Sequence, residues 1–229
     1  MCQDRINNLV DNFNNYLNIF SERNQLCGPS IYFHNRIMGI LRETTLSSLQ
    51  NQLWFSEYIY AVLVSWGMHR MDRGAQLKDF PVFHSVITNF IQNLIPISHL
   101  SITELTENNI TSIINLFEEN SVMHSIPKLA GNSKALHHIL PNIIPPIDGN
   151  YTIKFFNLRN RRRGQGNNAK MIDESNNFEF IIKKYQHIIN TINWNEIHYN
   201  GEMNATRIKL VDNAIIGYRL EQKAAEKSK

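Results

Sequence analysis

The apolar residues of this chain recur with the period of an α-helix, and no other feature limits its possible folds as strongly. The clearest stripe runs from Phe178 to Ile192, with apolar positions three or four residues apart, and similar stripes run from Ile6 to Phe20 and from Phe83 to Leu94. This spacing places apolar side chains on one helix face, whereas a strand needs alternation at every second residue. We therefore expect an all-α fold.

The chain should form a single globular helical domain over residues 1–229, because this length can bury a core without metals or disulfides. The remaining apolar patterns predict helices at about 31–43, 53–66, 107–119, 133–140, 151–156 and 206–222. One break stands out, at about residues 157–177, which are rich in Arg, Asn and Gly and lack apolar periodicity. We expect a mobile basic loop there.

Cysteine content and apolar run length suggest where the protein resides. The two cysteines, Cys2 and Cys27, do not have the paired spacing of a disulfide framework or a zinc site. The start of the chain is polar, unlike a secretory signal, and its apolar runs are shorter than the roughly 18 residues of a membrane span. We expect a cytoplasmic protein without membrane contact.

Positive charge is concentrated in one segment, although the net charge is only +3. Residues 79–127 contain no Lys or Arg, whereas residues 154–170 contain no acid and carry a basic cluster. Such a cluster attracts phosphate without reading base sequence. The sequence therefore predicts DNA binding through Arg159, Arg161, Arg162 and Arg163, and an ordinary solvated loop is the alternative.

Residues 125–156 contain the most distinctive order of residues. A predicted tight turn at Gly131 leads into a short apolar helix carrying Lys134, and a proline-containing loop then presents Asp148 ahead of another helix. A carboxylate near a sugar can stabilise developing positive charge or orient water. A lysine desolvated by apolar neighbours can lose its proton and attack the sugar carbon. Lys134 and Asp148 can therefore supply chemistry at a sugar carbon.

This order resembles the helix-hairpin-helix DNA glycosylases. In that family a glycine hairpin grips a DNA phosphate, a lysine begins the following helix, and an aspartate follows about twenty residues on. The resemblance implies a helix-hairpin-helix-like element with phosphate contacts at Gly131, Asn132 and Ser133. It also implies a base-excision glycosylase acting on DNA, with Asp148 and Lys134 as its catalytic residues. Lys134 would be an attacking amine if the enzyme also nicks the strand.

Plainer interpretations of these residues stay open. Lys134 could be an ordinary exposed helix residue, and Asp148, which precedes Gly149, could belong to a turn or cap a helix. The alternative function is a non-catalytic nucleic-acid-binding or regulatory all-α module. An all-α interaction or scaffold protein would follow if Lys134 and Asp148 lay far apart and the Arg cluster faced bulk solvent away from any cleft.

A base pocket is predicted from an aromatic segment followed by polar residues. Enzymes that extrude a base hold it between aromatic or apolar side chains. Trp66, His69, Arg70 and His138 could line such a pocket, although an aromatic stripe more often packs in a core, and at least one of the adjacent residues His137 and His138 should do so.

The histidine pattern and the absence of phosphate-cradling motifs argue against a metal or cofactor. None of the nine histidines forms the His-x-x-x-His pair typical of a helical metal site. We expect neither metal nor cofactor. Near the end of the chain, Arg207 and Lys209 begin a predicted helix and Asp212 follows one turn later. This group suits either a structural network or a phosphate contact.

Overall fold

The computed structural model describes residues 2–23, 26, 28–68, 76–158, 167–203 and 205–227. Within these residues the chain forms α-helices and short 3-10 helices and no β-strand, with an isolated bridge between Leu77 and Met123. The predicted all-α fold is confirmed.

The helices follow one another with short connections. In chain order they are α1 (Cys2–Asp11), α2 (Phe13–Arg23), α3 (Gly28–Glu43), α4 (Leu46–Leu49), α5 (Leu53–Ser65), α6 (Phe80–Leu94), η2 (Ile95–Ile97), η3 (Ile102–Glu104), α7 (Glu107–Glu119), α8 (Leu129–Ile139), α9 (Thr152–Phe155), α10 (Asn167–Thr191), η4 (Trp194–Glu196) and α11 (Arg207–Lys227).

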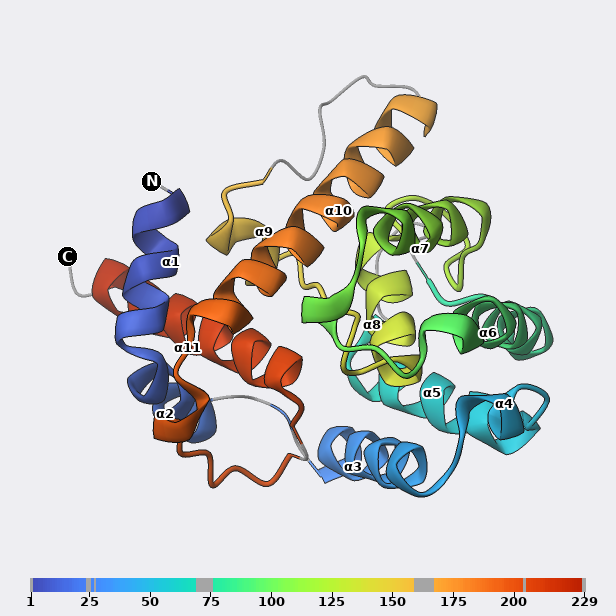
Figure 1. Ribbon diagram of the computed structural model, residues 1–229, viewed down its shortest axis with the longest axis horizontal. Helices are drawn as coiled ribbons and strands as arrows, with labels where there is room; N and C mark the ends of the chain where they lie inside the picture. Colours follow the sequence, from blue (N-terminus) through green and yellow to red (C-terminus); the bar gives the residue numbers. More distant parts are fainter. Residues whose placement is uncertain are drawn as a thin grey trace.

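The helices form two groups that share one core. Figure 1 shows α1, α2 and α11 together at one end and α3 to α8 at the other, with the long helix α10 crossing between them. Contacts of α10 with both α7 and α11 join the two groups. Buried apolar side chains from Ile6 to Tyr218 belong to a single cluster. The two groups are therefore held by one continuous apolar core.

Helix α8 lies at the centre of this arrangement and packs against α3, α5, α6 and α10. Ten of its eleven residues are buried. Five of these are polar: Asn132, Ser133, Lys134, His137 and His138. A buried polar group without a partner costs free energy, so the neighbours of α8 must supply hydrogen bonds as well as apolar contacts.

The first turn of α8 is closed by a side chain from α10. A carboxylate oxygen of Glu174, itself buried, accepts hydrogen bonds from the backbone N–H groups of Lys128 and Leu129, at 2.9 and 3.0 Å. The start of a helix carries free N–H groups and partial positive charge, so it favours an anion. Here an internal carboxylate fills that role.

The predicted tight turn at Gly131 is wrong, because Gly131 lies inside α8 and is buried. The Asn132 amide bonds to the backbone of Val122 and Asn120, and the Ser133 hydroxyl accepts from the N–H of Ile147. Both side chains are fully buried. The expectation that Gly131, Asn132 and Ser133 contact a DNA phosphate is therefore wrong: these positions are engaged inside the fold.

The predicted loop at 157–177 is too long, because α10 begins at Asn167. The sequence pattern missed the first turns of α10 because two of their buried positions are the polar residues Glu174 and Ser175. Polar residues at buried positions interrupt the apolar period while leaving the helix intact. Residues 159–166, which include the four predicted DNA-binding arginines, lie outside the described residues.

Helices α2 and α11 approach each other closely at Gly217. This glycine is buried, and a Cβ atom added there would collide with the backbone carbonyl of Tyr16 on α2. Backbone atoms cannot rotate away as a side-chain end can. The rings of Tyr16 and Tyr218 also meet edge to face, with centroids 5.3 Å apart. The close contact therefore requires a residue without a side chain.

We expect Gly217→Ala to destabilise the protein by about 1–3 kcal/mol, because the methyl group must push α2 and α11 apart. Gly39→Ala is the matched control, since Gly39 lies inside α3 with no atom within 4 Å of an added Cβ. That change should be neutral or stabilise by up to about 1 kcal/mol through helix propensity. Urea denaturation measures both values, and equal effects would contradict the close packing at Gly217.

Candidate functional site

One open cavity, of about 380 Å³, brings together residues from α2, α3, α5, α8, α11 and the segment between α8 and α9. Its polar and aromatic lining includes Trp66, Lys134, Asp148, Tyr151, Lys209 and Asp212. Two of these, Lys134 and Asp148, are the predicted catalytic pair, and Trp66 is a predicted base-pocket residue. We call this cavity the Trp66 pocket.

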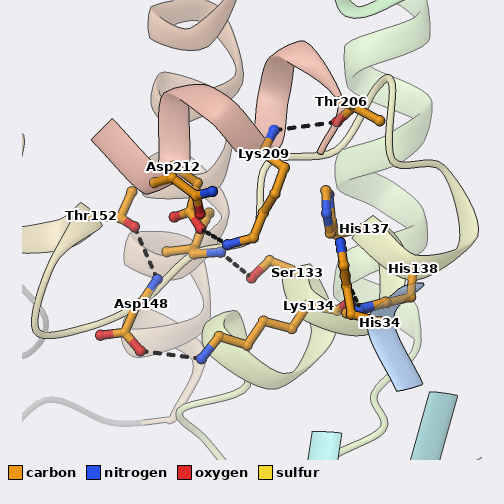
Figure 2. Close-up of polar contacts among 12 residues, drawn as sticks. His34, Ser133, Lys134, His137, His138, Asp148, Thr152, Thr206, Lys209 and Asp212 are labelled. Atoms are coloured by element: carbon orange, nitrogen blue, oxygen red, sulfur yellow. Dashed lines mark hydrogen bonds and ion pairs between the residues drawn. The ribbon is translucent and has the colours of Figure 1, made fainter. Parts of the chain in front are cut away.

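Lys134 and Asp148 form an ion pair in this pocket, with 3.1 Å between Nζ and Oδ2. The Lys134 side chain is 8% exposed and that of Asp148 is 31% exposed. Figure 2 shows the two side chains facing each other, Lys134 from α8 and Asp148 from the segment before α9. Lys134 is therefore not an ordinary exposed helix residue. Asp148 retains a surface open to a ligand.

Hydrogen bonds fix Asp148 from its neighbours in the chain. Its backbone N–H donates to the Thr152 hydroxyl at 3.1 Å, and Oδ1 accepts from the backbone N–H of Asn150 at 2.7 Å. The preceding N–H, of Ile147, donates to the hydroxyl of Ser133 on α8 at 3.1 Å. The turn-forming role considered for Asp148 is thus real. It coexists with the ion pair because each role uses a different carboxylate oxygen.

The surroundings of Asp148 keep it ionised. Burial alone would raise the pKa of this carboxyl group, but the charge of Lys134 and hydrogen bonds from Asn150, Lys134 and Tyr151 together lower it below its ordinary value. Opposite charge and donated hydrogen bonds both stabilise the carboxylate form. Asp148 is a carboxylate at neutral pH, and acts as a hydrogen-bond acceptor toward anything in the pocket.

A second ion pair lies deeper in the same pocket. Lys209 Nζ and Asp212 Oδ2 are 2.6 Å apart on neighbouring turns of α11, and their side chains are 3% and 5% exposed. Burial raises the pKa of Asp212, and the charges of Lys209 and Lys134 counteract this rise. The electrostatic effect of Lys134 on Asp212 means that the two pairs share one local field.

Trp66 connects the two pairs. The Lys134 and Lys209 ammonium groups lie 5.8 and 5.5 Å from the centre of its ring, within the range of a cation–π contact. The buried His34 ring stacks against Trp66 at 6.0 Å. Trp66 itself is partly exposed and lines the pocket. Both interpretations of Trp66, as core and as pocket wall, therefore apply.

The predicted base-pocket role of His138 is wrong, because the side chain is fully buried and does not line the Trp66 pocket. His138 Nε2 lies 3.2 Å from His34 Nδ1, and His138 Nδ1 lies 2.8 Å from the backbone oxygen of Lys134. Burial lowers the pKa of His138 well below its ordinary value, with further lowering by His34 and His137. This ring is a neutral support for α8 and Trp66.

The structure does not test the predicted roles of the remaining site residues. His69, Arg70, Arg159 and Arg161–Arg163 lie outside the described residues. In the part of the chain that is described, no group of three His, Cys, Asp or Glu side chains could hold a metal ion. None of the helices described is long and apolar enough to cross a membrane.

Sequence reasoning considered Lys209 and Asp212 together but did not place them in the pocket. The available signal was an acid and a base three residues apart among apolar neighbours, since Ile208, Val211 and Ile215 are all buried. Charged residues on the apolar face of a helix are rarely buried unless they are paired. Phe20, Arg23 and Tyr151 also line the pocket and carried no signal of their own.

The comparisons with known proteins gave no relative. No protein-family model matches the chain, and neither a curated protein nor a solved structure matches it. Function must therefore be inferred from the chemistry of the Trp66 pocket, which offers an ionised carboxylate, a paired amine and an aromatic wall.

Replacing Asp148 with Asn should change how stability depends on pH. The folded-state pKa of Asp148 is lowered, so its contribution to stability is present above the ordinary carboxyl pKa of about 4 and is lost as pH falls through the lowered value. Asp148→Asn lacks this contribution. The difference in unfolding free energy between the wild type and the variant should therefore shrink between about pH 6 and pH 3.

Urea denaturation across this pH range measures that difference. Carboxyl groups far from Asp148 contribute equally to both proteins and cancel in the subtraction. A difference that stayed constant or grew toward acid would show that the ion pair with Lys134 does not set the ionisation of Asp148.

Proposed function

We propose that this protein cleaves the N-glycosidic bond of a damaged or modified base in DNA, with Asp148 and Lys134 at the reacting bond. The observation that supports this most is the convergence of Asp148, Lys134 and Trp66 in one open cavity. These residues come from three separate parts of the chain. A chance ion pair on the surface would not be expected to lie beside an aromatic side chain that buried histidines hold in place.

The pocket suits a base that has left the DNA stack. Such a base loses its stacking partners and needs aromatic or apolar surface in their place. Trp66, Tyr151 and Phe20 supply that surface here. The acid-free segment 154–170, which begins just after Tyr151, favours a substrate that carries phosphate groups.

In the proposed reaction Asp148 acts on the sugar. As the bond between C1′ and the base nitrogen breaks, its electron pair leaves with the base and positive charge develops on the sugar. The Asp148 carboxylate stabilises that charge and accepts a proton from a water molecule whose oxygen bonds to C1′. Lys134 holds the carboxylate ionised and oriented.

A second route uses Lys134 itself. Its ammonium passes a proton to Asp148, which lies within hydrogen-bond distance, and the free amine bonds to C1′ as the base leaves. The departing base takes a proton from the attacking nitrogen. The C1′–O4′ bond then breaks as the nitrogen forms a double bond to C1′, and the proton on Asp148 passes to O4′. This leaves a lysine–sugar Schiff base that permits strand nicking. Borohydride reduces such a Schiff base to a stable amine, so trapping separates this route from the water route.

The test is base release from oligonucleotides that carry a panel of damaged and modified bases. Asp148→Asn should lower the release rate by at least about 100-fold, as expected for loss of a group that acts on the transition state. Lys134→Ala should abolish any borohydride-trapped protein–DNA adduct if Lys134 is the nucleophile. If the wild type releases a base but forms no adduct, the water route applies.

Lys183→Ala is the matched control, because Lys183 also forms ion pairs, with Glu107 and Glu179, but on the exposed surface of α10. It should leave release unchanged, and thermal melting should confirm that all variants are folded. DNA binding without base release or trapping across the whole panel would contradict catalysis. It would favour the non-catalytic nucleic-acid-binding module.

A further inference from the structure

Charge is balanced inside the Trp66 pocket. Each interior lysine is matched by one aspartate, Lys134 by Asp148 and Lys209 by Asp212. A phosphate group placed inside would have to displace a carboxylate from a lysine and leave that carboxylate without its partner. Breaking a buried pair in this way is unfavourable. The interior therefore suits an uncharged ligand group.

The mouth of the pocket is different, because it carries cations. Arg23, an exposed residue at the end of α2, lines the pocket. Lys223 on α11 does not line the pocket, but its ammonium lies 4.6 Å from the ring centre of the pocket residue Tyr151. Among the described residues no acidic side chain forms an ion pair with Arg23 or Lys223. These cations are available to an anion.

The aromatic wall narrows the choice of the uncharged group. Trp66 and Tyr151 favour a flat ring system. The ammonium groups of Lys134 and Lys209 already take the cation–π contacts of Trp66. A positively charged ring would be repelled by these two ammonium groups, and it would gain no cation–π contact with Trp66.

We propose that the ligand of this pocket is a nucleotide unit, with an uncharged base against Trp66 and its phosphate outside, held by Arg23 and Lys223. This inference rests on the proposed function, which already places the base in the pocket. What is new is the phosphate contact with Arg23 and Lys223 and the preference for an uncharged base. In nucleic-acid recognition, phosphate contacts commonly position the nucleic acid while contacts to the base determine which base is bound.

The experiment measures binding rather than catalysis, with a fluorescent single-stranded DNA oligonucleotide and the same oligonucleotide lacking its bases. The double variant Arg23→Ala/Lys223→Ala should bind both probes about tenfold more weakly. It should also reduce the slope of log Kd against log salt by about 1.4, or 0.7 for each lost phosphate contact. Unchanged affinity and slope would overturn the proposed phosphate contacts.

Lys184→Ala is the matched control, because Lys184 also lies over an aromatic ring, that of Phe180, at 5.4 Å, but does not line the pocket. It should change the affinity less than about twofold, since a single cation away from the binding site contributes little. An effect as large as that of the double variant would mean that positive charge in general, not the pocket mouth, binds the strand.

Trp66→Leu tests the place of the base. It should weaken binding of the intact oligonucleotide by about tenfold, as expected for loss of one stacking contact. Binding of the probe without bases should be unchanged, which also shows that the variant is folded. Equal weakening of both probes, or of neither, would overturn the proposal that the base enters the pocket.

Two further arms identify the source and the charge of the ligand. If a nucleoside 5′-monophosphate displaces the fluorescent strand, a free nucleotide is sufficient for binding. If it does not, while the unlabelled strand does, the ligand is the nucleic-acid strand. An oligonucleotide with 7-methylguanine, a cationic base, should bind no better than one with guanine, and tighter binding would contradict the preference for an uncharged base. Base release plays no part in these measurements, so the two proposals can fail separately.

Discussion

Helix α8 buries polar side chains on several faces, and the need to satisfy them organises the structure around it. Ser133 fixes the segment that leads to Asp148, and Lys134 pairs with Asp148 itself. His138, on the next turn, supports both the backbone of Lys134 and the ring of Trp66. An apolar helix in this place would pack as well, but it would leave the pocket without its charged groups. The same hydrogen bonds that make burial of α8 possible also position the candidate site.

The two ion pairs explain why the pocket is organised before a ligand arrives. Removing one partner of a buried pair typically costs about 3–5 kcal/mol, so Lys209 and Asp212 hold each other firmly. Lys134 and Asp148 are more accessible, and Asp148 keeps a free edge. The deeper Lys209–Asp212 pair is thus held in place inside the pocket, and the outer Lys134–Asp148 pair is the one that a ligand can reach. In the proposed reaction, such preorganisation means that little rearrangement is needed when charge develops in the pocket.

The fold could be predicted from the sequence wherever apolar residues kept a helical period, as in α6 and the second half of α10. It could not be predicted where polar residues occupy buried positions, because the period then disappears. Glu174 and Ser175 hid the start of α10, and Gly131 suggested a turn although it lies within α8. Lys134, Asp148 and Trp66 were identified from residue type and order. The Lys209–Asp212 pair was not assigned to the pocket, because neither helix pattern alone shows that α8 and α11 line the same cavity.

The hydrogen bonds from Lys128 and Leu129 to Glu174 also bear on the order in which the chain can fold. The capping carboxylate lies 46 residues after Lys128, so it comes from a helix that follows α8 and α9 in the chain. Closing a contact over that distance is costly in chain entropy and is repaid only when both helices are formed. We expect the first turn of α8 to become stable late, after α10 has docked. A chain that is still emerging from the ribosome and has not yet reached residue 174 would hold Lys134 on a helix whose start is not yet fixed.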